Sequence, residues 1–86
     1  MRSITIRIMK ASGLHARPAA NLMKAAKKYK SDVRVDKNGE PHNAKSLVDI
    51  LSLGVNMGDE ITLTCEGEDE EEAASYLKQF LESPDE

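Results

Sequence analysis

The first residues of the chain alternate between apolar and polar side chains. Ile4, Ile6 and Ile8 are separated by single polar residues, and this period of two is typical of a strand with one buried face. The alternation returns over residues 32–36 and 61–65. The pattern therefore predicts three strands, each with an apolar face that needs a cover.

A fourth strand is expected from turn chemistry. Asn38-Gly39 follows the second strand, and this dipeptide favours a two-residue hairpin turn. The chain would then return over residues 40–43. Pro41 lies in this return segment and cannot donate a backbone hydrogen bond to a neighbouring strand. We therefore expect the segment at an edge of the sheet.

Between the strands the period changes to that of a helix. Over residues 16–29 the apolar positions recur at i, i+3, i+4 and i+7, and they are Ala19, Leu22, Met23 and Ala26. This spacing places them on one helix face. Pro18 fits the first turn, where its missing N–H costs nothing. The range is therefore predicted to form an amphipathic helix.

Two further helices are predicted later in the chain. Residues 46–49 have the Ser-x-x-Asp form of a capping box, which predicts a short helix that continues to Leu51. The last helix is expected over residues 69–82, because acidic side chains fill its first turn, where the helix dipole favours them. Residues 83–86 are expected to fray.

The predicted order is strand, helix, strand, strand, helix, strand, helix. Four strands with one apolar face need one cover, which three amphipathic helices can supply. We therefore expect an α+β fold, a two-layer open-faced sandwich whose second sheet face is bare. A chain of 86 residues predicts one domain, 1–86.

Composition narrows the classes of function. A net charge of −3 and an aromatic content of 3% argue against direct nucleic-acid binding, which needs excess cations and stacking platforms. The apolar stretches are too short to span a bilayer. Cys65 is the single cysteine and has no partner for an internal disulfide. We expect a cytoplasmic protein without nucleic-acid or membrane contacts.

Candidate chemistry lies at the predicted start of the first helix. His15 is placed where the first helical turn presents unpaired backbone N–H groups and where the dipole attracts anions. Arg17 adds a permanent cation whose donors suit phosphate oxygens. A neutral imidazole nitrogen is a competent nucleophile, so the stretch predicts a transient phosphohistidine. The residues alone also allow a surface histidine with one local hydrogen bond, and Ser12 either approaches the phosphate or only forms the turn.

Two motifs resemble those of a known family. Residues 13–19 (Gly-Leu-His-Ala-Arg-Pro-Ala) are similar to the active-site signature of HPr, the histidine-containing phosphocarrier family of the phosphoenolpyruvate-dependent sugar phosphotransferase system. Residues 45–47 and 51–54 resemble the second signature of that family, around its regulatory serine. Residues 57–61 and 67–70 also match in position, so the resemblance covers nearly the whole chain.

The resemblance implies a fold and an activity. Members of the family form an open-faced sandwich of four antiparallel strands covered on one face by three helices. His15 would accept a phosphoryl group from phospho-Enzyme I and pass it to sugar-specific EIIA domains, while Arg17 would stabilise the bound phosphate. Such a protein is a covalent carrier in a relay rather than an enzyme, and it needs no cofactor.

Ser46 has two expected roles that do not exclude each other. As a helix N-cap it would contribute about 1 kcal/mol to stability. The resemblance also implies a regulatory phosphorylation site for an HPr kinase/phosphorylase. The modified protein would then act with a catabolite-control transcription regulator in catabolite repression.

Partner proteins are expected to dock around His15. Apolar residues beside the active-site turn would make the contacts, and lysines would form a cationic rim that meets acidic partner faces. The predicted set is Leu14, Ala20, Lys24, Lys27, Leu47 and Leu51. Two other residues are expected to be structural, with His42 on the surface and Cys65 in the core. Neither shares a ligand-like spacing with His15, so no metal site is expected.

Two other functions stay open at this point. A regulatory relative would have the same fold and histidine but would feed a signalling branch without sugar transport. A plain binding module would carry His15 without using it. The histidine and the two signatures together favour the sugar-transport branch with serine control.

Overall fold

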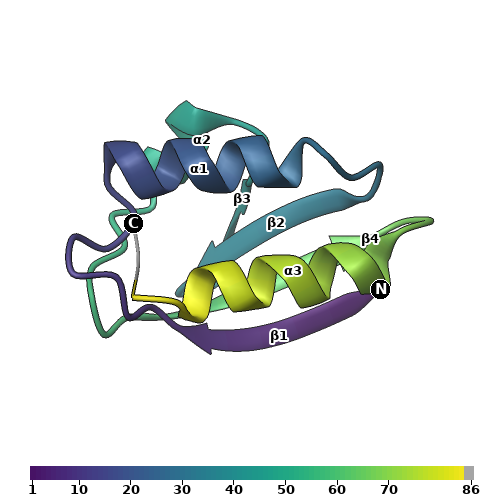
Figure 1. The fold of residues 1–86 in the computed structure, drawn as a ribbon. Coiled ribbons are helices and arrows are strands. Elements are labelled where there is room, and N and C mark those ends of the chain that lie inside the picture. The colour runs from purple at the N-terminus through teal and green to yellow at the C-terminus, as the bar shows by residue number, and fades with distance from the viewer. Residues whose placement is uncertain (85–86) are drawn as a thin grey trace.

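The computed structural model describes residues 1–84 and contains the predicted order of elements (Figure 1). Within these residues the elements are β1 (Arg2–Arg7), α1 (Ala16–Ala26), β2 (Asp32–Lys37), β3 (Glu40–Asn43), α2 (Leu47–Ser52), β4 (Glu60–Glu66) and α3 (Glu70–Glu82). Ser83 and Pro84 follow α3 as a bend. The rest of the segment expected to fray, residues 85–86, lies outside the described part.

The strands form one antiparallel sheet in the order β1-β4-β2-β3. β4 lies between β1 and β2, so that Leu63 pairs with Ile4 on one side and with Val35 on the other. β3 lies at an edge, as expected from Pro41, because that proline has no N–H for a further neighbour. The predicted α+β sandwich is therefore confirmed.

The helices cover one face of this sheet (Figure 1). Alternation aims the apolar strand residues at the helices, and these residues are almost fully buried: Ile6, Val33, Val35, Ile61, Leu63 and Cys65. Side chains of α1 and α3 complete the core, among them Leu22, Leu77 and Leu81. Each such burial contributes about 2 kcal/mol. Cys65 lies in the core as predicted, and burial raises the pKa of its thiol.

α1 ends earlier than its apolar pattern predicts. The last bond of helical span runs from the Lys27 amide to the Met23 carbonyl. The next two amides, of Lys28 and Tyr29, donate instead to carbonyls three residues back, which is the tighter geometry common at helix ends. The prediction of helix to residue 29 is therefore wrong by one turn. None of the helices in residues 1–84 has the length and apolar character to cross a membrane.

Asp69 joins α3 to the segment that follows α1. It is the N-cap residue of α3, but its side chain makes no bond to that helix. Its carboxylate accepts instead from the backbone N–H groups of Lys30 at 2.8 Å and Ser31 at 2.9 Å, and from the Ser31 hydroxyl. The Ser31 hydroxyl and these amides lower the pKa of Asp69 to about 2. The acidic start predicted for this helix thus has a tertiary role.

One fully buried cation fastens the loop after β1 to the end of α3. Lys10 donates from Nζ to the Ser83 carbonyl at 3.0 Å, and its ammonium lies 4.3 Å from the centre of the Phe80 ring. A cation is favourable at a helix C-terminus and over an aromatic face. The segment that leads to His15 is therefore anchored to the last helix.

Candidate functional site

The turn before His15 is pressed against a loop that follows α2. Gly13 adopts φ +64°, its N–H donates to the Lys10 carbonyl, and the Leu14 N–H donates to the Val55 carbonyl at 3.1 Å. A β-carbon added to Gly13 would lie 2.2 Å from the Val55 oxygen. Glycine is therefore required here both by the backbone angle and by the close approach of the second loop.

His15 begins α1 without capping it. The residue is extended, at φ −78° and ψ −169°, and its carbonyl accepts from the Ala19 N–H at 2.8 Å. Its side chain makes no capping bond and is exposed. The N–H groups of Ala16 and Arg17 lie in the first turn, where a helix offers them no acceptor. An anion on the His15 ring would therefore face a helix start with donors available.

Arg17 adds positive charge to this helix start. Its side chain is exposed, and within the part of the chain that the structure describes it makes no ion pair. No acidic residue lies in the first turn of α1. The guanidinium therefore keeps its full donor set for an incoming anion.

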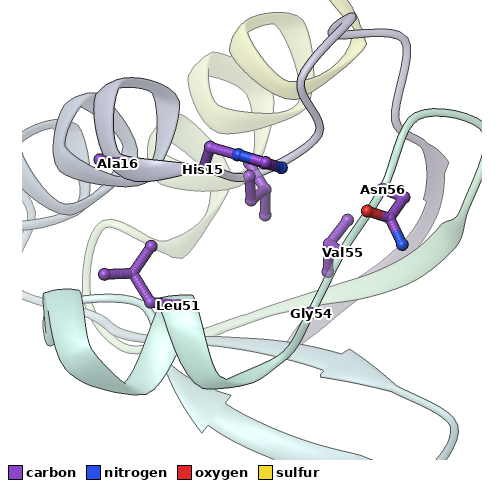
Figure 2. Close-up of a pocket in the computed structure, with 7 residues that line it drawn as sticks. His15, Ala16, Leu51, Gly54, Val55 and Asn56 are labelled. Carbon is purple, nitrogen blue, oxygen red and sulfur yellow. The ribbon is translucent and has the colours of Figure 1, made fainter.

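A hollow of about 230 Å³ lies beside the imidazole. Seven residues from three segments line it: Leu14, His15, Ala16, Leu51, Gly54, Val55 and Asn56. In Figure 2 the His15 ring extends from the start of α1 towards the loop that carries Val55 and Asn56. This volume is below the roughly 300 Å³ at which small-molecule pockets usually begin. The hollow is therefore small for a substrate pocket.

The predicted partner residues separate into exposed and buried ones. Lys24 and Lys27 are exposed, Ala20 and Leu47 are half-buried, and Leu51 is 43% exposed at the rim of the hollow. These five residues lie on α1, the residue that ends it, and α2. They can form one face with His15.

Leu14 does not belong to that face. It is 3% exposed and is part of the core cluster. The prediction of Leu14 as a partner contact therefore places it wrongly, because its neighbour His15 points outward while Leu14 points into the core. Its backbone N–H donates to the Val55 carbonyl and so helps to hold the turn against that loop.

Sequence reasoning missed two parts of the site. Val48 is 78% exposed on α2, and its position one residue after Leu47 could have indicated an outward-facing apolar side chain. The loop of Gly54, Val55 and Asn56 was missed because its contact with the active-site turn joins segments far apart in the chain. No local pattern reports such a contact.

Ser46 caps α2 as predicted. Its hydroxyl accepts from the Asp49 N–H at 3.3 Å. The reciprocal half of the capping box is absent, since the Asp49 carboxylate accepts from the Asn43 N–H at 3.0 Å. The Ser46 N–H donates to the Asn43 carbonyl instead. The capping-box prediction is therefore half right.

His42 is not the plain surface residue that was expected. Its side chain is 15% exposed and is held between β3 and α2 by polar contacts with both. The expected absence of a metal site stays a prediction. Among residues 1–84, no group of three or more His, Cys, Asp or Glu side chains is arranged to hold a metal ion.

Comparisons with known proteins identify the family. Residues 2–83 match the family model PTS-HPr, "PTS HPr component phosphorylation site". The chain belongs to the HPr family. This is the phosphocarrier family of the phosphotransferase system that the two signatures resemble.

Individual relatives agree with this assignment. The phosphocarrier protein HPr of Buchnera aphidicola is 47% identical over 88% of this chain and 89% of that protein. The HPr-like protein Crh of Bacillus subtilis is 44% identical over 83% of this chain and 84% of that protein. The crystal structure of an HPr from Thermoanaerobacter tengcongensis superposes with a TM-score of 0.94 and 45% identity, over 98% of this chain and 94% of that one.

Proposed function

We propose that this protein is a phosphoryl carrier that accepts its group from phospho-Enzyme I on His15 and passes it to sugar-specific EIIA domains. One observation carries the proposal: an exposed histidine begins a helix whose first turn holds available N–H donors and an unpaired arginine. The family supplies the identity of donor and acceptor. The relay is proposed to run in the cytoplasm within one domain, residues 1–86.

The proposed transfer exchanges one phosphorus–nitrogen bond for another. The lone pair of the His15 Nδ1 attacks the phosphorus of the donor's phosphohistidine, and the donor nitrogen leaves with the bonding pair. Charge on the three phosphoryl oxygens is then shared by the Arg17 guanidinium and the Ala16 and Arg17 N–H groups. The reverse exchange delivers the group to the acceptor. Alignment supplies most of the rate because the bonds are alike.

The protein is proposed to act as a carrier rather than as an enzyme. The hollow beside His15 is small and has an exposed side chain at its edge. A carrier of this kind is itself chemically altered in each half-reaction. No cofactor enters the scheme, since every reacting atom belongs to His15 or to the partner's phosphoryl group.

We define the docking surface as Ala20, Lys24, Lys27, Leu47, Val48 and Leu51. Its exposed apolar side chains are those of Val48 and Leu51. Its lysines can steer acidic partners and speed their association. Weak, fast binding suits a relay in which the carrier must leave each partner quickly.

Phosphorylation of Ser46 is proposed as the regulatory step, carried out by an HPr kinase/phosphorylase. A phosphate at the N-cap of α2 is electrostatically tolerable because the helix dipole is positive there. Its charge would lie beside Leu47, in the docking surface, and would repel acidic partners. The modified form is proposed to bind a catabolite-control transcription regulator. The similarity to Crh keeps a purely regulatory role as the second candidate.

The test is intact mass after incubation with Enzyme I and phosphoenolpyruvate. Wild type should gain one acid-labile phosphoryl group, and His15→Ala should gain none. His42→Ala is the matched control, since it removes the other histidine of the sequence and should still gain the group at the end point of the incubation. No gain in wild type, with Enzyme I active on another carrier, would contradict the proposal and favour the regulatory role.

A further inference from the structure

His42 connects β3 to α2 through a set of short polar contacts. Its Nδ1 lies 2.9 Å from the Asp49 carbonyl oxygen, 3.0 Å from Asp49 Oδ1 and 3.1 Å from Ser52 Oγ. Its Nε2 lies 3.7 Å from the Glu40 carboxylate. With 15% of the side chain exposed, the ring is fixed between the hairpin and the helix.

These contacts assign the protons of the ring. Nδ1 faces a carbonyl, a carboxylate and a hydroxyl oxygen, so the neutral ring carries its proton on Nδ1 and donates it there. A second proton enters at Nε2, which faces Glu40. The ring then becomes a cation between the carboxylates of Glu40 and Asp49. Protonation therefore strengthens an attachment that the neutral ring already makes.

α2 depends on such anchors for its position. It has six residues, of which only Ile50 is buried. A helix this short is not stable by itself. The Ser46 cap holds its first turn, and Asp49 ties the same turn to β3 through the Asn43 N–H. His42 contacts the other carboxylate oxygen of Asp49. The helix and the hairpin are therefore joined at this one residue.

The charges around His42 come from three elements. Glu40 belongs to β3 itself, Asp49 belongs to α2, and Asp32 and Arg34 of β2 line the same hollow. Arg34 is paired with Glu66 at 3.4 Å, which reduces its repulsion of a protonated ring. The Asp49 carbonyl, followed by the Asp49 and Glu40 carboxylates, raises the pKa of His42 against the opposing effect of desolvation.

We propose that His42 is a positioning residue whose protonation tightens the attachment of α2 to the β2–β3 hairpin and thereby holds the α2 part of the docking surface in place. The structural half of this proposal concerns the isolated protein. The second half rests on the proposed carrier function, because Leu47, Val48 and Leu51 matter only if partners dock on them. A raised pKa means that the added stability is complete below the ordinary histidine value and is lost as pH rises through the folded one.

The structural half is tested by NMR on the whole protein. His42 should titrate above about 6.5. Exchange of the Ile50 amide, which donates to the Ser46 carbonyl, reports the attachment of α2. After correction for intrinsic rates, His42→Asn should exchange faster than wild type, and the ratio should be larger at about pH 5 than at about pH 8.5. Between these two pH values, the ratio should change by about tenfold for each unit by which folding raises the pKa of His42.

His42→Asn keeps a donor near the position of Nδ1 and removes the titration, which makes it a fair comparison. His15→Asn is the matched control for this exchange measurement, because it removes the other histidine without touching α2. A pKa at or below about 6.5, or a ratio for His42→Asn that is equal at both pH values, would overturn the proposal. Either result is independent of any partner.

The functional half is tested by the rate at which Enzyme I charges His42→Asn relative to wild type. Effects of pH that wild type and variant share cancel in this ratio. The KM ratio should rise at acid pH while the kcat ratio stays near one, because His42 affects docking and not the reacting atoms. Equal KM at every pH would overturn the functional half. Absence of charging in wild type would instead contradict the proposed function, and the exchange result would stand.

Discussion

The first turn of a helix has unpaired backbone N–H groups, and the starts of α1 and α2 treat these groups in opposite ways. At α2 the Ser46 hydroxyl accepts the Asp49 N–H, and an acidic residue occupies the first turn. At α1 the His15 side chain makes no capping bond, and the first turn has no acidic residue. A cap stabilises a helix, so its omission at α1 leaves donors available to a ligand. The uncapped start is the one we assign to phosphoryl transfer.

The largest expected effect comes from breaking the support of the α1 start. Gly13→Ala should destabilise the protein by about 3 kcal/mol, because the backbone angle is unfavourable and the new methyl group meets the Val55 carbonyl. Urea unfolding measures the change. Gly39→Ala is the control, since its φ is also positive but nothing lies within 4 Å of the added carbon. Equal losses at the two glycines would refute a special role for the contact with Val55.

The next effect concerns the charge at the uncapped helix start. Arg17→Ala should slow charging of His15 by about 30-fold, which corresponds to the loss of about 2 kcal/mol of charge-assisted hydrogen bonding. Stability should hardly change, since Arg17 is exposed. Rapid-quench charging by Enzyme I measures the rate. Arg2→Ala, which removes an exposed arginine paired with Glu71 of α3, should charge like wild type, and an equally large loss of rate there would point to a general effect of charge.

A smaller effect is expected at the capped start. Ser46→Ala should cost about 1 kcal/mol of unfolding free energy, whereas Ser46→Asp keeps an acceptor and should remain folded by circular dichroism. The aspartate should nevertheless slow charging of His15, because it adds negative charge beside the docking surface. Ser75→Ala, at an exposed position of α3, should change neither property. Unaltered charging of Ser46→Asp would remove the basis for serine control.

The start of α3 adds a third case to this comparison, and the pH dependence of stability tests it. Asp69 has a pKa lowered to about 2 by hydrogen bonds from Ser31 and Lys30. Its stabilisation is present above the ordinary aspartate value of about 3.9 and is lost as pH falls through the folded value. Urea midpoints of wild type and Asp69→Asn should therefore converge between about pH 4 and pH 2. An equal difference between the two proteins at about pH 4 and about pH 2 would contradict the role of the Asp69 carboxylate.

The fold could be predicted because its strands alternate cleanly. Ile6, Val35 and Leu63 each sit in a period of two, and burial follows that period in the structure. Propensity and caps located the helices, apart from the last turn of α1. The strand order, with β4 in the middle, was beyond local patterns because it depends on pairings between distant segments.

The candidate site was predicted only in its local part. His15 and Arg17 share one helical turn, so their motif could be recognised. His42 and Lys10 could not be assigned, because each looks like a surface residue among its sequence neighbours. Their partners come from α2 and from the end of α3. Leu14 was misplaced for the same reason, since its burial in the core depends on tertiary packing.

The pairing of Gly13 with Val55 has a consequence for synthesis. His15 leaves the ribosome early, but the loop that supports its turn and the α3 end that anchors Lys10 are made much later. Contacts between such distant segments form late in folding. A growing chain would therefore expose His15 before the rest of its proposed site is made, so only the finished chain would enter the proposed relay.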